Sequence, residues 1–461
     1  MKVISNYQNK KVLVLGLAKS GTTAAKLLHQ LGAIVTVNDG KPLEENMEAQ
    51  ALLELGIKVI AGSHPIELLD EEFELLVKNP GIPYTNPMIQ AAMAKNIPVI
   101  TEVELAYEIS EAPIVGITGT NGKTTTTTMI NNLLNADKNS EFGFVAGNIG
   151  EVASQVAQHV TKDNVMVTEL SSFQLMGIET FKPKVAVIVN IFEAHLDYHG
   201  NREEYVKAKW EIQKNMTADD VLVLNFNQAE LRQLAQKTKA TVIPFSTKEK
   251  HLEGAYVEDG AIYFKEEYVM QADQIGVLGE HNLENALAAI VVAKLYNIPN
   301  EAIIQALATF GGVAHRMEYV GNILGRKVYN DSKATNILAT QTALSAFKDN
   351  KDKVVLVAGG LDRGNDFIEL EPSLTNLKAV SLYGETKHKL AESAERVGIS
   401  SLALNENLVE AVNQAFAYTV EGDIILFSPA CASWDQFKNF EIRGDQFKQA
   451  IKNIEEEWNN K

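Results

Sequence analysis

One glycine-rich segment has the residue types that bind polyphosphates. It reads Gly116-Ile-Thr-Gly119-Thr-Asn-Gly122-Lys123-Thr124-Thr125, follows the apolar run Ile114–Ile117 and precedes a stretch with helical spacing. Small residues between a strand and a helix let backbone N–H groups surround phosphate oxygens, and the helix N-terminus adds partial positive charge. We therefore expect Lys123 to contact the β- and γ-phosphates of a nucleotide and the Thr124 hydroxyl to face Mg²⁺. A plain glycine-rich turn is the alternative, because Ile117 stands where the strict pattern GxxxxGK has its first glycine.

A carboxylate and an imidazole follow two later apolar runs. Glu169 ends the run Val165–Glu169, and His195 comes shortly after the run Val185–Asn190. We interpret the two runs as neighbouring strands, and open α/β sheets bind ligands at the carboxyl ends of their strands. Together the two side chains could ligate a divalent cation, with phosphate oxygens and water as its other ligands. Either residue alone is more often structural or solvated.

Two helical segments carry polar groups whose role the sequence leaves open. Lys209 lies in the helical stretch Tyr205-Val-Lys-Ala-Lys209, where composition alone favours a solvated helix lysine. His281, Asn282 and Asn285 lie at the start of another helix, where they are either purine contacts or helix caps.

Both ends of the chain also hold polar segments. Gly16-Leu-Ala-Lys-Ser-Gly21, followed by Asp39, resembles a weak dinucleotide-binding fingerprint, and a plain strand–helix turn is an equally good interpretation. Towards the other end, His315-Arg316-Met-Glu318 and Asn330-Asp331-Ser332-Lys333-Ala-Thr335-Asn336 gather charges and hydrogen-bond donors in loops. Such loops are more often functional than structural.

These groups need strands and helices to position them. Short β-branched runs alternate with amphipathic stretches along almost the whole chain, which is typical of an α/β fold with buried parallel strands. We expect three α/β domains in series, with boundaries near Ser110–Pro113 and Gly311–Gly312. The predicted strands are Val12–Leu15, Ile34–Val37, Leu75–Val77, Pro98–Ile100, Ile114–Ile117, Val165–Glu169, Val185–Asn190, Val221–Asn225, Val242–Phe245, Val354–Ala358, Ala379–Tyr383 and Ile424–Phe427.

Composition narrows the class of protein further. The chain has 461 residues, and its 42 Lys and Arg against 59 Asp and Glu give a formal net charge of −17. A chain with this negative charge is a poor general binder of nucleic acid or anionic lipid. An anionic ligand must therefore be held by a local pocket. The single cysteine, Cys431, cannot form an intrachain disulfide, which fits a reducing compartment. Because the sequence has neither a signal-peptide pattern nor a long apolar run, we expect a cytoplasmic protein without membrane insertion.

Seven motifs occur along the chain in a fixed order. They are Gly-Thr-Asn-Gly-Lys-Thr-Thr, Glu-Leu-Ser-Ser-Phe-Gln, His195 before Leu-Asp-Tyr-His-Gly, Lys209, His-Asn-x-x-Asn, His-Arg-x-Glu and Asp-Ser-Lys-Ala-Thr-Asn. This series resembles the Mur ligases, the ATP-dependent amide ligases of peptidoglycan precursor synthesis, and it covers nearly the whole chain. The resemblance implies a Rossmann-like UDP-substrate-binding domain over 1–110, a central P-loop ATPase domain over 111–312 and a Rossmann-like amino-acid-binding domain over 313–461.

Features at the two ends narrow the expected substrates. The segment Gly16–Gly21 and the segment Ser428-Pro-Ala-Cys-Ala-Ser433-Trp-Asp-Gln-Phe-Lys-Asn-Phe440-Glu-x-Arg-Gly are similar to the branch that ligates D-glutamate to UDP-N-acetylmuramoyl-L-alanine. Folylpolyglutamate synthase, a relative with similar chemistry, is an alternative that these two segments disfavour. A regulator that senses nucleotides without ligation is a second alternative, which the retention of Glu169, His195 and Lys209 disfavours.

The resemblance also implies roles for individual residues, and Lys123, Lys209 and His195 are the expected catalytic residues. ATP would be bound by Gly119, Thr120, Asn121, Gly122, Lys123, Thr124, Thr125, Asn285, Arg316 and Asp331. Two Mg²⁺ ions would be held by Thr124, Glu169, His195 and a carbamylated Lys209. The UDP-substrate would contact Leu17, Ser20, Asp39, Asn148 and His195, and D-glutamate would contact Lys333, Thr335, Arg363, Ser433 and Phe440. Arg363 stands where the family often has a lysine, and arginine keeps the charge while binding a carboxylate bidentately.

The implied reaction has two steps. ATP phosphorylates the L-alanine carboxylate, and the amine of D-glutamate then attacks the acyl phosphate. Because water would hydrolyse this intermediate, we expect the C-terminal domain to close over the central one.

Overall fold

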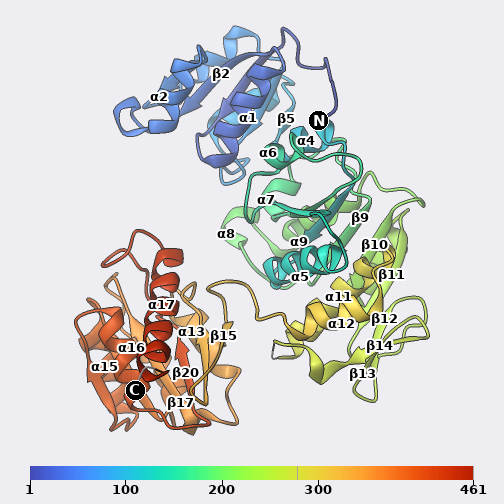
Figure 1. Ribbon diagram of the computed structural model, residues 1–461. Helices are drawn as coiled ribbons and strands as arrows, with labels where there is room; N and C mark the ends of the chain where they lie inside the picture. Colours follow the sequence, from blue (N-terminus) through green and yellow to red (C-terminus); the bar gives the residue numbers. More distant parts are fainter. Residues whose placement is uncertain (278, 460–461) are drawn as a thin grey trace. The chain divides into compact units, whose positions relative to one another are not determined.

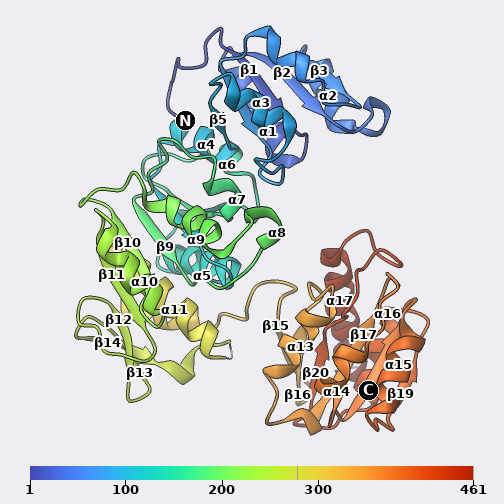
Figure 2. The same ribbon diagram turned by 180° about the vertical axis from the view of Figure 1, so that it is seen from behind.

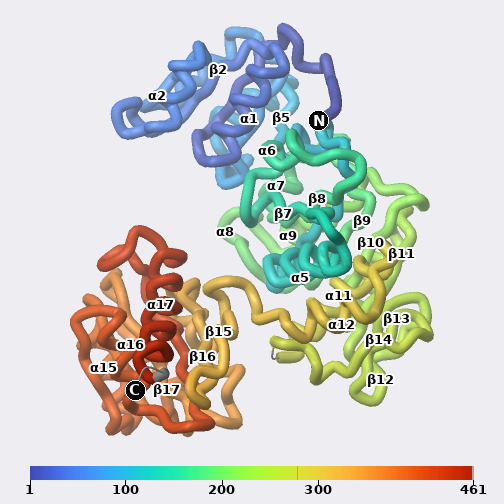
Figure 3. Tube along the Cα trace, in the orientation of Figure 1, coloured from blue at the N-terminus to red at the C-terminus, as the bar shows by residue number. Residues whose placement is uncertain are grey.

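The computed structural model describes residues 1–277 and 279–459 and has an α/β architecture with three sheets (Figure 1). Contacts divide the chain into two compact units, Met1–Ile275 with Glu280–Thr309, and Gly276–Gly279 with Phe310–Lys461. Each unit is described by itself. The trace in Figure 3 passes through the three sheets in sequence order, from blue to red. The predicted fold class is confirmed, whereas the three domain ranges given above stay a prediction.

The first sheet is entirely parallel, with strand order β3-β2-β1-β4-β5. The strand order reverses between β1 and β4, which is where sheets of this kind bind ligands. Helices α1 and α4 cover one face and α3 the other (Figures 1 and 2). The elements are β1 (Lys11–Leu15), α1 (Lys19–Gln30), β2 (Ile34–Asp39), α2 (Met47–Glu54), β3 (Lys58–Ala61), β4 (Leu75–Lys78), α3 (Pro87–Ala94), β5 (Val99–Ile100) and α4 (Glu102–Ile109).

The second sheet has nine strands in the order β14-β13-β12-β11-β10-β9-β6-β8-β7. Its strands are β6 (Ile114–Thr118), β7 (Gly143–Gly147), β8 (Val165–Glu169), β9 (Val185–Ile188), β10 (Val221–Asn225), β11 (Thr241–Ser246), β12 (Ala255–Glu258), β13 (Ala261–Phe264) and β14 (Glu267–Gln271). Its helices are α5 (Lys123–Asn135), α6 (Ala153–Ala157), α7 (Ser172–Leu175), α8 (Leu196–His199), α9 (Arg202–Trp210), α10 (Ala229–Leu234), α11 (Glu280–Leu295) and α12 (Asn300–Ala308).

The strand order corrects one sequence-based expectation. We took the strands before Glu169 and His195 to be neighbours, but β6 lies between β8 and β9 and pairs with both in parallel. The reason is that the chain adds strands on both sides of β6, so sequence order does not give neighbours. The glycine-rich loop after β6 is therefore flanked by the loops after β8 and β9.

Strands at the edge of this sheet were not among the predicted ones. β12 and β13 form an antiparallel hairpin around Asp259 and Gly260, whose φ angles are 51° and 76°. Asp-Gly with two positive φ angles is a favoured two-residue hairpin turn. The sequence thus contained the signal for this hairpin.

The third sheet has the order β15-β16-β20-β17-β18-β19, and only β15 is antiparallel to its neighbour. Separate apolar clusters cover its two faces. The loops after β16, β20 and β17 leave from adjacent strands at one edge. The elements are β15 (Glu318–Ile323), β16 (Arg326–Asn330), α13 (Ile337–Ser345), β17 (Val354–Gly359), α14 (Glu371–Leu374), β18 (Ala379–Tyr383), α15 (Lys387–Arg396), β19 (Leu402–Leu404), α16 (Leu408–Ala417), β20 (Ile424–Phe427) and α17 (Phe440–Asn459).

Short 3₁₀ helices complete the secondary structure, at Leu43–Glu45, Ile66–Glu71, Glu211–Gln213, Ala235–Lys237, Ala272–Gln274, Lys351–Lys353 and Ile368–Leu370. Among the described residues, no helix is both long and apolar enough to span a membrane.

Buried hydrogen bonds join the first sheet to the second. The Thr101 backbone N–H donates to the Gly177 carbonyl at 2.9 Å, and the Thr101 hydroxyl donates to the Gln174 carbonyl at 2.7 Å. The Glu104 carboxylate accepts the backbone N–H groups of Glu179, Thr180 and Phe181. One apolar cluster continues from the first sheet into the second, so the two pack as one unit.

We predict that Gly177→Ala destabilises this junction. A Cβ at Gly177 would lie 2.7 Å from Thr101 Cγ2 and 2.8 Å from Thr101 N, closer than van der Waals contact allows. Such overpacking costs about 1–3 kcal/mol, so the midpoint of urea unfolding should fall. Gly81→Ala is the control, because its Cβ would meet Asn79 Oδ1 at an ordinary 3.5 Å. Equal stability of the two variants would contradict this packing.

Candidate functional site

The glycine-rich loop joins β6 to α5, as the sequence predicts. Gly122 has φ +78°, and a Cβ there would lie 2.4 Å from Asn285 Oδ1 on α11. Only glycine fits that conformation and that approach. Asn285 is 2% exposed and also accepts a hydrogen bond from the Thr126 hydroxyl at 3.1 Å. The first turns of α5 and α11 are thus in contact beside the loop, through Thr126 and Asn285.

Asn190, after β9, fixes the shape of this loop. Its carbonyl accepts from the Thr120 N–H at 2.9 Å, and its Oδ1 accepts from the Asn121 N–H at the same distance. Its Nδ2 donates back to the Asn121 carbonyl at 3.1 Å. Sequence reasoning missed this role, although a polar residue directly after an apolar strand was a signal for it.

Two lysines converge on the carbonyl of Gly119. Lys209 Nζ donates to it at 2.7 Å and Lys123 Nζ at 3.0 Å, and Lys123 also donates to the Thr120 carbonyl at 2.9 Å. Lys209 is only 2% exposed, so the alternative of a solvated helix lysine is wrong. Burial, followed by the nearby charge of Lys123, places the pKa of Lys209 well below its usual value.

Tyr205, one helical turn before Lys209 on α9, packs against the same loop. Its hydroxyl shares a 3.0 Å hydrogen bond with the Thr120 hydroxyl, and its ring lies 4.8 Å from Lys209 Nζ. Tyr205, Ala208 and Lys209 form the buried face of α9, which explains why a helix lysine points inward.

Glu169 is a buried carboxylate with one oxygen left over. Its Oε1 accepts from Asn148 Nδ2 at 2.8 Å, whereas its Oε2 is buried without a hydrogen-bond partner. A buried anionic oxygen without a donor is unfavourable unless a cation balances it. The site therefore fits a hard cation such as Mg²⁺. Mg²⁺ commonly takes one or two carboxylates and completes its shell with phosphates and water, so the finding that no cluster of three metal-ligating side chains occurs among the described residues is compatible with it.

His195 begins α8 in a left-handed conformation with φ 55°. Its ring contacts Phe173 at 5.1 Å and Tyr205 at 6.3 Å between centroids. Phe173 belongs to α7, which follows Glu169, so segments after β8, β9 and the start of α9 meet around this ring. At the other end of α8, His199 is stacked on Phe173 and shares a 3.0 Å hydrogen bond with Ser172.

The predicted UDP contacts Leu17, Ser20 and Asp39 lie together at the edge of the first sheet. Asp39 accepts the backbone N–H of Leu17 at 2.6 Å and that of Lys41 at 2.8 Å, so its carboxylate shapes both turns. The Ser20 hydroxyl accepts from Asn79 Nδ2 at 3.1 Å. The other two predicted contacts, Asn148 and His195, belong to the second sheet.

The second unit brings its predicted residues to one sheet edge. Lys333 and Thr335 follow β16, Arg363 follows β17, and Ser433 and Phe440 follow β20. Lys333 Nζ lies 5.7 Å from the Phe440 ring centroid, and the Arg363 guanidinium lies 4.8 Å from the ring of Trp434. Trp434, 63% exposed, is a residue that sequence reasoning did not single out.

Arg443 joins two of these loops from inside. It is fully buried and donates to the Ser332 hydroxyl at 3.1 Å, the Ser332 carbonyl at 2.7 Å and the Cys431 carbonyl at 3.0 Å. The Cys431 thiol is also buried, 3.3 Å from the Thr386 hydroxyl, and burial raises its pKa to about 11. In the sequence, Arg443 is part of the C-terminal motif, and nothing there indicates that it is buried.

Asp331 is the buried acid of this edge, 5% exposed. It accepts from the Met317 N–H at 3.1 Å and from the Ser428 hydroxyl at 2.9 Å. Burial nevertheless raises the pKa of Asp331 to about 7, against the opposing effects of these bonds and of Arg316.

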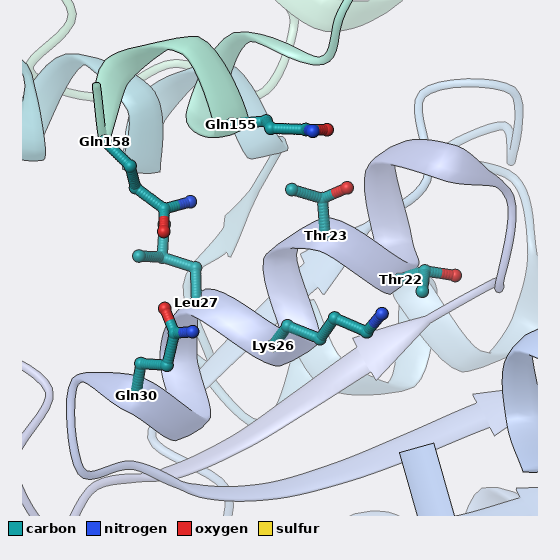
Figure 4. A pocket seen from close by; sticks show the side chains of 7 residues that line it. All are labelled: Thr22, Thr23, Lys26, Leu27, Gln30, Gln155 and Gln158. Carbon is teal, nitrogen blue, oxygen red and sulfur yellow. The ribbon is translucent and has the colours of Figure 1, made fainter. Parts of the chain in front are cut away.

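A cavity of about 200 Å³ lies between α1 and α6. Figure 4 shows Thr23 and Lys26 of α1 on one side, and Gln155 of α6 with Gln158, the residue after that helix, on the other. None of the predicted site residues lines it.

Comparison with known proteins identifies the class. The chain matches the Mur ligase MurD-like N-terminal domain over residues 10–101, the Mur ligase middle domain over 117–293 and the Mur ligase glutamate ligase domain over 315–431. The chain therefore belongs to the Mur ligase family. Relatives named UDP-N-acetylmuramoylalanine–D-glutamate ligase include that of Enterococcus faecalis, 64% identical with 99% of both chains covered, and that of Lactococcus lactis, 61% identical with 98% of this chain and 100% of the relative covered.

Solved structures show the same fold at lower identity. The alanine ligase MurC of Thermotoga maritima matches with TM-score 0.55 and 19% identity, covering 96% of this chain and 99% of the other. MurF of Thermotoga maritima, solved in complex with ADP, matches with TM-score 0.55 and 17% identity, covering 98% of each chain.

The raised pKa of Asp331 predicts a pH dependence of stability. The pKa of Asp331 is about 7 in the folded protein, against an ordinary value of 3.8, so the folded state holds this proton more tightly than the unfolded state. The resulting stabilisation is fully present below about pH 4 and is lost as the pH rises to about 7. Asp331→Asn cannot ionise, and its amide can donate to Ser428, whose hydroxyl can turn to Thr340. Its free energy of unfolding should therefore rise relative to that of the wild type between pH 4 and 7, by at most about 4 kcal/mol, and the difference should stay constant above pH 7.

The matched control is Asp349→Asn, which removes one carboxylate at an exposed position. Buried Glu102, whose pKa burial also raises to about 7, is present in every variant and cancels in the comparison. A constant difference for Asp331→Asn across this range would show that Asp331 is ionised in the folded protein throughout.

Proposed function

We propose that this chain ligates D-glutamate to UDP-N-acetylmuramoyl-L-alanine with ATP as the energy source, in the cytoplasmic synthesis of peptidoglycan precursors. The observation that carries this proposal is the relationship over the whole chain to D-glutamate ligases at 59–64% identity. The phosphate-type loop beside buried Glu169 and Lys209 supports it independently. Neither folylpolyglutamate synthesis nor nucleotide sensing explains relatives of this name over the full length.

The chemistry requires activation of a carboxylate. A carboxylate is a poor acyl donor, because its leaving group would be oxide. Transfer of the γ-phosphoryl group of ATP to the L-alanine carboxylate gives an acyl phosphate with a good leaving group. The neutral amine of D-glutamate then attacks the carbonyl carbon, and the tetrahedral intermediate collapses to an amide and inorganic phosphate.

The residues of the glycine-rich loop are proposed to hold the ATP phosphates, and Lys123 to neutralise their charge. Bound Mg²⁺ supplies further charge neutralisation during phosphoryl transfer. The orphaned Oε2 of Glu169 supports a cation there, with Thr124, His195 and a carbamate on Lys209 as the other proposed ligands, at two sites. Asn285, Arg316 and Asp331 are proposed nucleotide contacts.

The lowered pKa of Lys209 supports carbamylation. A neutral amine attacks CO₂ and releases a proton, which leaves an N-carboxylate anion. The carbamate nitrogen keeps one N–H, so the 2.7 Å hydrogen bond to Gly119 can persist. The same modification replaces a positive charge beside Lys123 with a negative one.

The two substrates are proposed to bind at two sheet edges. Leu17, Ser20 and Asp39, with Asn148 and His195, would contact the UDP-sugar. Lys333, Thr335, Arg363, Ser433 and Phe440 would contact D-glutamate, whose two carboxylates match the two cationic side chains of this set.

The decisive experiment measures phosphate release. We expect release from ATP only when UDP-N-acetylmuramoyl-L-alanine and D-glutamate are both present, with formation of one amide per phosphate. Release that depends on a folate substrate would support the folylpolyglutamate alternative. Nucleotide binding without turnover would support the regulator.

Lys209 gives the sharpest test of the carbamate. Lys209→Ala should lose at least about 10²-fold in kcat, as is typical for loss of one charge-stabilising group, and added acetate should restore part of it by filling the vacated site. Lys209→Arg should stay inactive, because a guanidinium does not form this anion. Lys207→Ala is the control from the same helix, since Lys207 is 68% exposed and forms a surface ion pair with Glu204. A fully active Lys209→Arg would exclude a carbamate.

Arg363 tests the proposed glutamate site. Because Arg363 projects from the loop after β17 beside Trp434, Arg363→Ala should raise the KM for D-glutamate about tenfold or more, the usual effect of losing a charged hydrogen bond. The KM for ATP should change less than twofold. Arg396→Ala, which removes a surface ion pair with Glu371, should leave both constants unchanged. Equal increases in both KM values for Arg363→Ala would contradict a glutamate contact.

A further inference from the structure

Lys78 is a buried lysine that neither the resemblance nor the proposed mechanism uses. It is the last residue of β4, the strand beside β1 where the order of the first sheet reverses. The crevice at such a point is bordered by the loops after the two strands. The loop after β1 carries Leu17 and leads to Ser20 at the start of α1, and the loop after β4 is the segment Asn79–Tyr84, which follows Lys78.

The ammonium group of Lys78 is bound by the backbone of its own loop. Nζ donates to the Ile82 carbonyl at 2.9 Å, to the Pro80 carbonyl at 3.2 Å and to the Tyr198 hydroxyl at 3.2 Å. These are the three shortest of its contacts, and an ammonium has three N–H donors; the Asn79 carbonyl lies farther away, at 3.5 Å. The side chain is 1% exposed, so each bond is made away from solvent.

The acceptors of Lys78 are carbonyls and a phenol rather than carboxylates. Two rings flank the charge, with Tyr84 at 4.9 Å and Tyr198 at 6.0 Å from Nζ. Burial lowers the pKa of Lys78 to about 7, which shows what this placement costs the charged form. An apolar residue here would avoid the free-energy cost of burying a charge. It would, however, remove the hydrogen bonds that Nζ donates to the Pro80 and Ile82 carbonyls.

The loop held by Lys78 contacts the glycine turn after β1. Asn79 Nδ2 donates to the Ser20 hydroxyl at 3.1 Å, and Ile82 packs so closely that a Cβ on Gly16 would lie 2.9 Å from it. A shift of the loop would therefore move side chains that contact the segment carrying Leu17 and Ser20.

The same ammonium reaches the second sheet through Tyr198. Tyr198 lies on α8, the helix that His195 begins, and its hydroxyl also donates to the Pro80 carbonyl at 3.0 Å or the Ile82 carbonyl at 3.1 Å. Its ring lies 4.3 Å from that of Phe173, which contacts His195. Lys78 thus ties together the two groups of residues proposed for the UDP-sugar.

We propose that Lys78 is a positioning residue for the UDP-sugar substrate: it fixes the loop Asn79–Tyr84 against α8, so that the crevice of the first sheet and His195 present one surface to the substrate. This role rests on the proposed function for the identity of the substrate. Lys78 itself is too deeply buried to contact the ligand.

The test compares Lys78→Met with the wild type in the full chain. Methionine keeps an unbranched apolar stem, one atom shorter, and removes the ammonium donors. Isothermal titration with UDP-N-acetylmuramoyl-L-alanine, without ATP, should show binding weakened about tenfold, and the KM for this substrate should rise equally. The KM values for ATP and D-glutamate and the kcat should change less than twofold. Lys58→Met, an exposed lysine of the same sheet paired with Glu71, is the control and should match the wild type.

Tyr198→Phe provides a second variant that leaves the lysine in place. It removes one acceptor of Lys78 and should weaken binding about threefold. The double variant should lose less than the sum of the two single losses, because the contact between Lys78 and Tyr198 is counted in both. Additive losses, unchanged affinity in either single variant, or equal rises in all three KM values would each overturn the proposal.

The failure of the proposed function is distinguishable from the failure of this inference. A wild-type chain that neither binds the UDP-sugar nor releases phosphate with D-glutamate would overturn the function itself. A wild-type chain that does both, alongside a Lys78→Met variant with unchanged affinity, would overturn only the role of Lys78. Circular dichroism of each variant verifies that it is folded.

Discussion

Two lysine amines share one carbonyl oxygen, that of Gly119, and this arrangement constrains the rest of the central site. Burial is the main reason why the pKa of Lys209 is low, and repulsion by the nearby charge of Lys123 lowers it further. Hydrogen bonds from Asn190 and Tyr205 fix the neighbouring residues Thr120 and Asn121 of the same loop. The carboxylate of Glu169, one oxygen of which has no hydrogen-bond partner, carries the charge opposite to that of the two lysines. The site is thus an arrangement of charges that lacks balance until anionic and cationic ligands enter it.

How far the sequence could predict this molecule depends on the range of each interaction. The glycine-rich loop, the strand ending in Glu169 and the α/β class follow from short patterns, because a buried strand and a helix N-terminus are local features. The hairpin at Asp259 was also local and could have been predicted from its turn residues. The position of β6 between β8 and β9 was not, because strand order depends on how the chain crosses over the sheet.

The burial of individual charges was the least predictable feature. Lys209 contacts a residue 90 positions away, and Lys78 meets Tyr198 at a separation of 120. In both cases a helix or strand residue that composition assigns to solvent is buried by a distant segment. Arg443 is a third example, held by Ser332 from a separation of 111. Each of these three cationic side chains lies beside a loop that is proposed to bind a substrate. Holding such a loop in one conformation offsets the cost of removing a charge from water.

The environment of Cys431 has a consequence for experiments on this protein. The thiol is buried next to Thr386 with its pKa raised to about 11, and its own carbonyl is bound by Arg443. Because thiolates rather than thiols react with alkylating reagents, the folded chain should resist them at neutral pH. The chain has one cysteine, so each alkylation event marks an opening of this one region. The rate of thiol labelling therefore measures how often the loops after β16 and β20 open, and the measurement needs no introduced probe.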